Sequence, residues 1–294
     1  MMVKDELTML DMNSLEKRTL LLEYLKLNSK VVNHKMIIVI ENAKIARLVY
    51  VCVKQTYNIS INITVRTQKR FRKKQIYILK IDDKIEEILK DINDSNEKHY
   101  DDEEKISMIR AHFLARGSIT DPKKSGYHFE IAFPHATWAR KTSKILKELN
   151  YKNRIIKRNE EYMIYIKAAE SISDILKLMG AQNAMFYFED IRIYRDHKNM
   201  VNRLNNCEVA NQEKVIETGL KQLDLIKYLK KNDLVILLDD KSKDVMEYRE
   251  QYPEVSYEEL ARIISLERGY NISKSGINHH FIKMKKIKER HSGC

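Results

Sequence analysis

One pattern of elements occurs twice in the first 180 residues, and this repeat limits the fold more than any other feature. In the first copy, helical periodicity alternates with strand patterns over residues 15–27, 31–40, 43–57, 59–81 and 84–92. The second copy has the same order over residues 105–116, 127–133, 137–149, 152–167 and 171–180. The repeat predicts a domain over residues 1–190 that contains two tandem αββαββ units, at about 15–92 and 105–180.

An acidic segment, residues 93–104, joins the two predicted units. Its carboxylates raise the question of a metal site, but they lack the spacing of metal ligands and lie in a polar run, so we expect a solvated linker. The chain has seven glycines and neither of the glycine-rich phosphate-binding motifs. We therefore expect no metal, no cofactor and no catalytic residues.

Basic residues gather at the turn of one predicted hairpin in each unit. The two sets are Arg66, Lys69, Arg70, Arg72, Lys73 and Lys74, and Lys152, Arg154, Lys157 and Arg158. Two such hairpins could form a saddle that makes accessory contacts to duplex DNA. Lysines at a hairpin also protect sheet edges from aggregation, and the sequence does not decide between these interpretations.

The C-terminal part reads as an all-α domain over residues 208–294, after an interdomain linker at 191–207. Ser256 and Glu259 have capping-box spacing, and Ser273 is a good N-cap for a second helix. Gly269 lies between the two helices and suits a turn that needs positive φ. This arrangement predicts a helix-turn-helix at about 256–290, in which the second helix enters the major groove of DNA.

The second helix has one apolar and one polar side. Ile277, Phe281 and Met284 follow the spacing of a buried stripe. The opposite side carries groups that hydrogen-bond to base edges or neutralise phosphate. The predicted DNA-binding residues are Ser256, Tyr257, Ser273, Lys274, Ser275, Asn278, His279, His280, Lys283, Lys285, Lys286 and Arg290.

Charge and hydropathy indicate the kind of partner. The formal net charge of +12 points to a polyanion. No apolar run reaches the length of about 18 residues that a membrane span needs. The first residues lack a signal region, and the three cysteines suit a reducing compartment. We therefore expect a cytoplasmic, nucleoid-associated protein without membrane contact.

Several stretches resemble a known family. The most specific are NRLNNCEVAN at residues 202–211 and SKSGINH at 273–279, and weaker ones are FLARGS at 113–118 and LMGA at 178–181. They resemble the WhiA family of bacterial DNA-binding regulators, which join a LAGLIDADG homing-endonuclease-like domain to a C-terminal helix-turn-helix. The resemblance implies an α+β fold of tandem αββαββ units followed by an all-α helix-turn-helix domain. It also implies regulation of transcription tied to cell division, chromosome segregation or differentiation.

The resemblance raises the question of nuclease activity. LAGLIDADG nucleases carry an acid at the end of each core helix, just before a glycine, where it holds divalent metal. Alignment of the two units places Leu27 and Arg116 at these positions, and neither is an acid. Departures from the family include His280, where arginine is usual, and Asn28-Ser29, where a glycine-bearing turn is usual. We therefore expect that this chain is not an enzyme.

Two other functions stay open at this stage. An architectural nucleic-acid-binding protein would rely on charge alone, and a ligand-gated regulator would sense a small molecule of unknown identity through the LAGLIDADG-like domain. The favoured prediction is a sequence-specific transcriptional regulator whose partner is double-stranded DNA. RNA polymerase or another transcription factor is a further expected partner.

Overall fold

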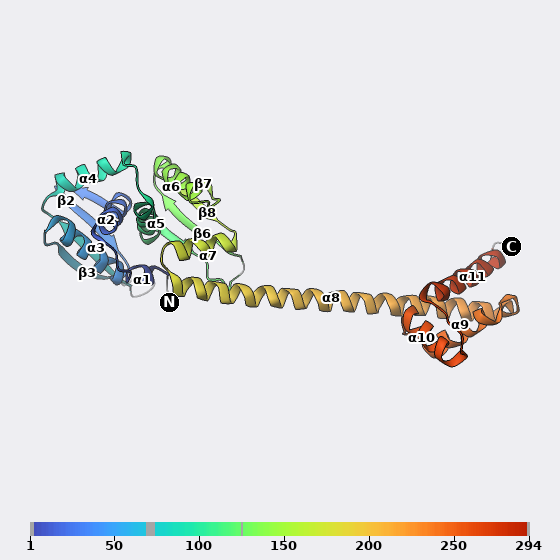
Figure 1. Cartoon of the computed structure of the whole chain (residues 1–294). Coiled ribbons are helices and arrows are strands. Elements are labelled where there is room, and N and C mark those ends of the chain that lie inside the picture. The colour runs from blue at the N-terminus through green and yellow to red at the C-terminus, as the bar shows by residue number, and fades with distance from the viewer. Residues whose placement is uncertain (1–2, 69–73, 125, 293–294) are drawn as a thin grey trace. The chain divides into compact units, whose positions relative to one another are not determined.

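The computed structural model describes residues 3–68, 74–124 and 126–292, which form two compact units, Met1–Asp196 and His197–Cys294 (Figure 1). The first unit is mixed α and β, and the second is helical. The predicted fold class is confirmed. Within the described residues, no helix is both long and apolar enough to cross a membrane.

The first unit contains the predicted repeat, preceded by the short helix α1 (Val3–Leu7). The first copy comprises α2 (Ser14–Asn28), β1 (Ser29–Val32), β2 (Lys35–Ile40), α3 (Ala43–Tyr57), β3 (Asn62–Gln68), β4 (Lys74–Ile81) and α4 (Ile85–Glu97). The second copy comprises α5 (Asp102–Arg116), β5 (Gly117–Ile119), β6 (Phe129–Phe133), α6 (Ala136–Glu148), β7 (Arg154–Arg158), β8 (Glu161–Ile166) and α7 (Ala169–Leu178). Both copies are therefore αββαββ units with one added helix.

Each copy forms its own four-stranded antiparallel sheet. The strand orders are β1-β2-β4-β3 and β5-β6-β8-β7, so the two sheets have the same topology. One face of each sheet is apolar and packs into the core, as Met36, Ile38 and Ile40 do on β2 and Phe129, Ile131 and Phe133 on β6. This period-two burial is what the alternating sequence predicts.

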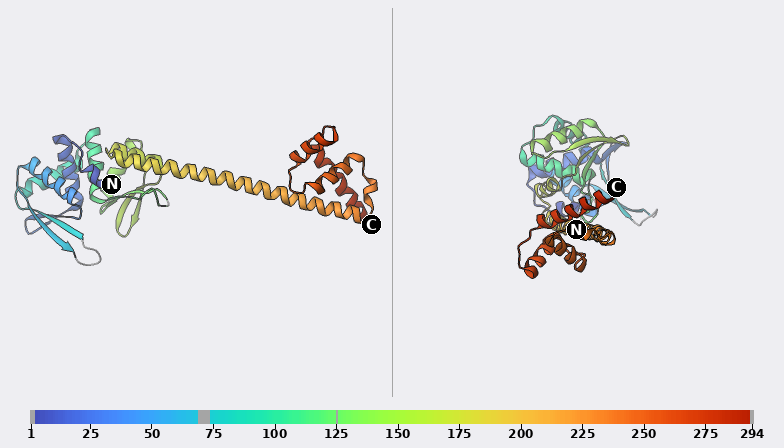
Figure 2. Two further views of the ribbon diagram at one scale, coloured as in Figure 1. Left: turned by 90° about the horizontal axis from the view of Figure 1, so that it is seen from below. Right: turned by 90° about the vertical axis from the view of Figure 1, so that its right-hand side faces the viewer.

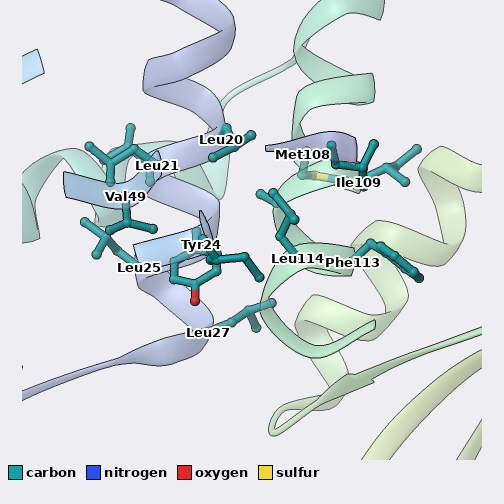
Figure 3. Close-up of a cluster of buried hydrophobic side chains, with 14 of the residues drawn as sticks. Leu20, Leu21, Tyr24, Leu25, Leu27, Val49, Met108, Ile109, Phe113 and Leu114 are labelled. Carbon is teal, nitrogen blue, oxygen red and sulfur yellow. The ribbon is translucent and has the colours of Figure 1, made fainter. Parts of the chain in front are cut away.

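The core helices of the two copies, α2 and α5, pack against each other (Figure 3). Leu20, Leu21 and Leu25 on α2 and Met108 and Ile109 on α5 are at most 1 % exposed. Burial of each such side chain stabilises the fold by roughly 1.5–3 kcal/mol. Neither copy can bury its core helix alone, so the repeat folds as one domain.

A polar cluster lies inside this apolar interface. The Glu23 carboxylate is 2.9 Å from His112 Nε2, and it accepts hydrogen bonds from Lys26 Nζ (2.6 Å) and Tyr100 Oη (2.7 Å). Burial would raise the pKa of Glu23, but His112 and Lys26 hold it well below its usual value. The cluster therefore contains a buried carboxylate that stays ionised.

The predicted acidic linker is wrong in two respects. The acidic linker is shorter than residues 93–104, since α4 continues to Glu97 and α5 begins at Asp102. Glu104 belongs to a capping box with Asp101 and is only 3 % exposed, because Thr19 and Lys98 bond its carboxylate.

The helix α8 (Gln182–Lys231) begins well before residue 208, where the predicted all-α domain starts (Figures 1 and 2). The expected linker, residues 191–207, lies within it, and the boundary between the units falls after Asp196. Asparagines at 202, 205 and 206 weaken the local helix signal. No proline or glycine interrupts the stretch from Gln182 to Thr218, so the backbone continues as helix.

The second unit continues with the 3₁₀ helix η1 (Leu234–Leu237), α9 (Asp240–Gln251), α10 (Tyr257–Arg268) and α11 (Lys274–Ser292). The end of α8 contributes Leu225, Ile226 and Leu229 to the core. The later helices add Val245, Met246, Tyr248, Leu260, Ala261, Ile264, Ile277, Phe281 and Met284. The three helices after η1 therefore share one core, in which α9 and α10 both pack against α11.

Candidate nucleic-acid interface

The turn between α10 and α11 has the expected helix ends. Ser256 Oγ accepts the Glu259 N–H at 3.2 Å and starts α10, and Gly269 ends that helix with φ of 72°. Ser273 Oγ accepts the Gly276 N–H at 3.2 Å and starts α11. Ser265 Oγ also accepts the Ile272 N–H at 3.1 Å, which ties the turn back to α10. These hydrogen bonds fix the position at which α11 begins relative to α10.

The apolar side of α11 is buried as predicted. Ile277 and Met284 have no exposed area, and Phe281 is 5 % exposed. They pack in one cluster with Leu260 and Ile264 of α10. The orientation of the opposite side is therefore set by the core.

That opposite side is exposed near the start of α11. Lys274, Ser275, Asn278 and His279 are all exposed. Lys274 and Asn278 make no hydrogen bond or ion pair with any other described residue, while Ser275 Oγ lies 3.0 Å from Ser273 Oγ. This arrangement presents one ammonium group, one amide and one imidazole to solvent.

Two predicted DNA-binding residues point into the protein. Tyr257 stacks on Phe281 with ring centroids 6.1 Å apart, and its hydroxyl bonds to Gln222 of α8. His280 Nδ1 lies 2.8 Å from Ser242 Oγ at the start of α9. Burial raises the pKa of Tyr257 and lowers the pKa of His280. Both side chains position α11 against its neighbours.

The other cations divide into paired and unpaired groups. Lys283 Nζ lies 3.3 Å from Asp239, and Lys285 Nζ lies 3.8 Å from Glu289. Lys286 and Arg290 are exposed and have no hydrogen bond or ion pair within the described part of the chain. Lys286 and Arg290 therefore carry charge that is free for a partner.

Sequence reasoning missed Arg249, which is 1 % exposed. Its Nη1 donates to the carbonyl oxygens of Tyr252 (3.2 Å), Pro253 (3.3 Å) and Val255 (2.8 Å), so it holds the loop that leads into α10. Burial lowers the pKa of this guanidinium. The only signal was a cation at the end of a helix that a proline follows, which is the usual place for a carbonyl-binding arginine.

The basic hairpins of the first unit are only partly described. Lys69, Arg70, Arg72 and Lys73 lie outside the described residues, as does the side chain of Lys74. The remaining basic residues are exposed, and they are Arg66, Lys152, Arg154, Lys157 and Arg158. Arg154 and Arg158 share one face of β7, while Lys157 lies on the other face, 5.9 Å from the Tyr162 ring.

The ends of the core helices correct the alignment of the two copies. α2 and α5 each have 15 residues and end at Asn28 and Arg116. Arg116 therefore corresponds to Asn28, and Leu27 is a buried core residue. Asn28 Nδ2 donates to the Ala115 carbonyl at 3.5 Å, and Arg116 Nη1 lies 2.5 Å from Glu161 Oε1. Neither helix end carries an acid.

A cleft of about 1730 Å³ opens beside these helix ends. Its lining includes Asn28, Arg116 and Glu161, and also Tyr77 and Tyr187. No group of three or more histidine, cysteine, aspartate or glutamate side chains in the described ranges is arranged to hold a metal ion. The cleft is lined by both polar and apolar side chains. Its cation Arg116 is already paired with the carboxylate of Glu161.

Three family models match the chain in succession. They are the WhiA N-terminal LAGLIDADG-like domain at residues 24–93, the WhiA LAGLIDADG-like domain at 105–198 and the WhiA C-terminal HTH domain at 201–288. The matches cover most of both copies of the repeat and most of the helical unit.

Similar proteins cover nearly the whole chain. Proteins from Bacillus cytotoxicus and Bacillus mycoides, each named "Probable cell division protein WhiA", are 35 % identical over 98 % of this chain and 95 % of their own length. The crystal structure of full-length DUF199/WhiA from Thermatoga maritima has a TM-score of 0.59 at 22 % identity, covering 98 % of this chain and 96 % of that one. The N-terminal LAGLIDADG domain of DUF199/WhiA matches with a TM-score of 0.51 at 22 % identity, over 61 % of this chain and 89 % of its own. These structures support the fold.

Proposed function

This chain belongs to the WhiA family, and we propose that it is a sequence-specific DNA-binding regulator of transcription. Its relatives carry the name of a cell division protein, so we place its target genes in cell division, chromosome segregation or differentiation. The proposed organisation is a degenerate LAGLIDADG-like domain at residues 1–190, a helical linker at 191–207 and a DNA-binding domain at 208–294.

The exposed start of α11 is the observation that carries this proposal. Asn278 and Lys274 project from a helix whose other side is fixed in the core, and neither has a partner in the described chain. An asparagine amide reads adenine in the major groove, and lysine reads guanine or binds phosphate. Because the first residues of a recognition helix contact base edges, these side chains suit direct readout of sequence.

We also propose that the protein binds DNA without cleaving it. Two-metal hydrolysis needs carboxylates that hold divalent cations against the scissile phosphates. Asn28 and Arg116 occupy the helix ends, and the guanidinium of Arg116 would repel a divalent cation. Glu161, a carboxylate of the same cleft, is already paired with Arg116.

The experiment that tests the regulator is selection of genomic fragments by the purified full-length chain at near-physiological salt. We expect one enriched motif, which a Lys274→Ala/Asn278→Ala double variant loses while its melting temperature stays unchanged. Point variants are preferable to deletion of α10 and α11, since these helices form part of the core of the second unit. If fragments are enriched without a common motif, and the double variant enriches them equally well, the result would instead support an architectural protein that binds DNA through charge.

A second function, sensing of a small molecule, is favoured by the cleft in the first unit. Its volume of about 1730 Å³ exceeds that of a typical ligand site, and it offers both aromatic and charged side chains. Thermal-shift screening of a metabolite set against the full chain tests this candidate. A stabilising compound should lose its effect in an Arg116→Ala variant, and absence of any stabilising compound would leave the DNA-binding function alone.

A further inference from the structure

An apolar segment of the second unit is exposed beside α11. The helix η1 consists of four consecutive apolar residues, Leu234–Leu237. Leu234 and Val235 pack partly against the core, but Ile236 is 84 % exposed and Leu237 is 59 % exposed. A run of this kind on the surface usually marks a contact with another molecule.

The segment forms one wall of a groove of about 560 Å³. Leu234 and Leu237 line it on one side, and the other side is a flank of α11. The lining residues of α11 are Lys283, Lys286, Ile287, Arg290 and His291. Their spacing of three and four residues places them on a single face of the helix. Lys274, Ser275, Asn278 and His279, at the start of α11, do not line the groove, whereas the predicted DNA-binding residues Lys283, Lys286 and Arg290 do.

The charges around the groove define its partner. Lys283 is paired with Asp239, whereas Lys286 and Arg290 have no acidic partner in the described chain. The groove therefore has an apolar wall and two free cations. A phosphate backbone offers no apolar group that could cover Ile236 and Leu237. An amphipathic helix with carboxylates beside its apolar face satisfies both features.

We propose that this groove docks an acidic amphipathic helix of a partner protein, while the start of α11 faces DNA. The apolar side chains of the partner cover Ile236 and Leu237, and its carboxylates pair with Lys286 and Arg290. This surface goes beyond the proposed DNA binding and does not depend on it. It would let one helix bring a protein to the DNA site that it reads.

The probe is a fluorescein-labelled helical peptide of about 18 residues, with leucines at i, i+3, i+4 and i+7 and glutamates on both flanks. We expect the full-length chain to bind it with a micromolar Kd. A matched peptide with glutamine in place of glutamate should bind at least about tenfold more weakly. Leu237→Asp and Arg290→Glu should each cause a similar loss. Lys285→Glu is the matched control, since Lys285 does not line the groove.

Two outcomes would overturn the proposal. One is failure of the acidic peptide to bind, and the other is binding that Leu237→Asp and Arg290→Glu leave unchanged in variants with wild-type melting temperature. If Arg290→Glu lowers affinity for all duplexes and spares the peptide, the groove contacts DNA instead. Asn278→Ala separates this test from the regulator proposal, because it should impair DNA discrimination and leave peptide binding intact.

Discussion

Glu23 Oε2 and His112 Nε2 lie 2.9 Å apart where α2 packs on α5, with both side chains buried. The pair joins the two copies of the repeat by a polar contact inside an apolar interface. Lys26, whose side chain is 4 % exposed, completes the cluster. A buried cation and a buried imidazole thus share one carboxylate, while Thr142 Oγ1 lies 3.1 Å from the other ring nitrogen of His112.

Glu23→Ala should lower the free energy of unfolding by about 3–5 kcal/mol, because it leaves Lys26 buried without its counter-charge. Chemical denaturation of the full chain measures this loss. Arg18→Ala is the control, since its ion pair with Asp91 is solvent-exposed and should contribute about 0–1 kcal/mol. Equal losses in both variants would show that the buried cluster is not what holds the two copies together.

The same carboxylate predicts a pH dependence. The folded state lowers the pKa of Glu23, so its stabilising contribution is complete above the pKa of the unfolded chain, which is about 4.3. It is lost as the pH falls below that value, since the unfolded state then takes up the proton first. Unfolding free energies measured between about pH 6 and pH 3 should therefore fall more steeply in the wild type than in Glu23→Gln.

Asn278→Ala should reduce discrimination between the selected motif and random duplex by about 1–3 kcal/mol. Lys285→Ala is the comparison, because loss of a phosphate contact should weaken all sequences alike. Fluorescence anisotropy with both duplexes at several salt concentrations separates the two effects. Equal losses on both duplexes for Asn278→Ala would remove that residue from base readout.

His280 predicts that the second unit is weaker at mildly acidic pH. Burial lowers the pKa of His280, although Asp239 opposes this shift. Below the ordinary histidine pKa of about 6.5, the unfolded chain binds the proton more readily, and stability declines. The melting temperature should therefore drop between pH 7.5 and pH 5.5 by more in the wild type than in His280→Gln. His279 is the exposed neighbour of His280, and the control variant His279→Gln should show the same drop in melting temperature as the wild type.

Gly219→Ala should destabilise the second unit. A Cβ atom at this position of α8 would lie 2.1 Å from the Pro253 carbonyl oxygen, where the backbone before α10 approaches the helix. Overpacking of this kind costs about 1–3 kcal/mol. Thr218→Ala, at the exposed neighbouring position, should change stability little, and thermal unfolding followed by circular dichroism compares the two. A wild-type melting temperature for Gly219→Ala would mean that the loop shifts freely.

Much of the fold follows from signals that lie close together in the sequence. Helix α3 has the predicted ends because Asn42 caps its start and Asn58, with φ of 52°, ends it. The extent of α8 was missed because asparagines at 202, 205 and 206 weaken its local helix signal. The burial of Glu104 was missed because it depends on a partner from a distant part of the chain. Glu104 bonds to Thr19 of α2.

The candidate site also combines features that the local sequence predicts with features that depend on distant residues. Helical periodicity predicts which side of α11 is exposed, so the placement of Lys274, Ser275, Asn278 and His279 followed from spacing alone. Tyr257 and His280 point inward because Gln222 and Ser242, on other helices, bind them. Residue type indicated DNA contacts for both, and only tertiary structure shows the positions that they hold.

The residues at the ends of α2 and α5 also limit how this domain could change. To carry a carboxylate at both helix ends, the chain would need new acids at both Asn28 and Arg116, in two separate copies of the repeat. An acid at Asn28 alone would face the Arg116 guanidinium and be neutralised by it, and an acid at Arg116 alone would stand beside the Glu161 carboxylate without a counter-charge. Neither single substitution would place a free acid at both helix ends. Two matched acids at these positions therefore require two coordinated substitutions, one in each copy of the repeat.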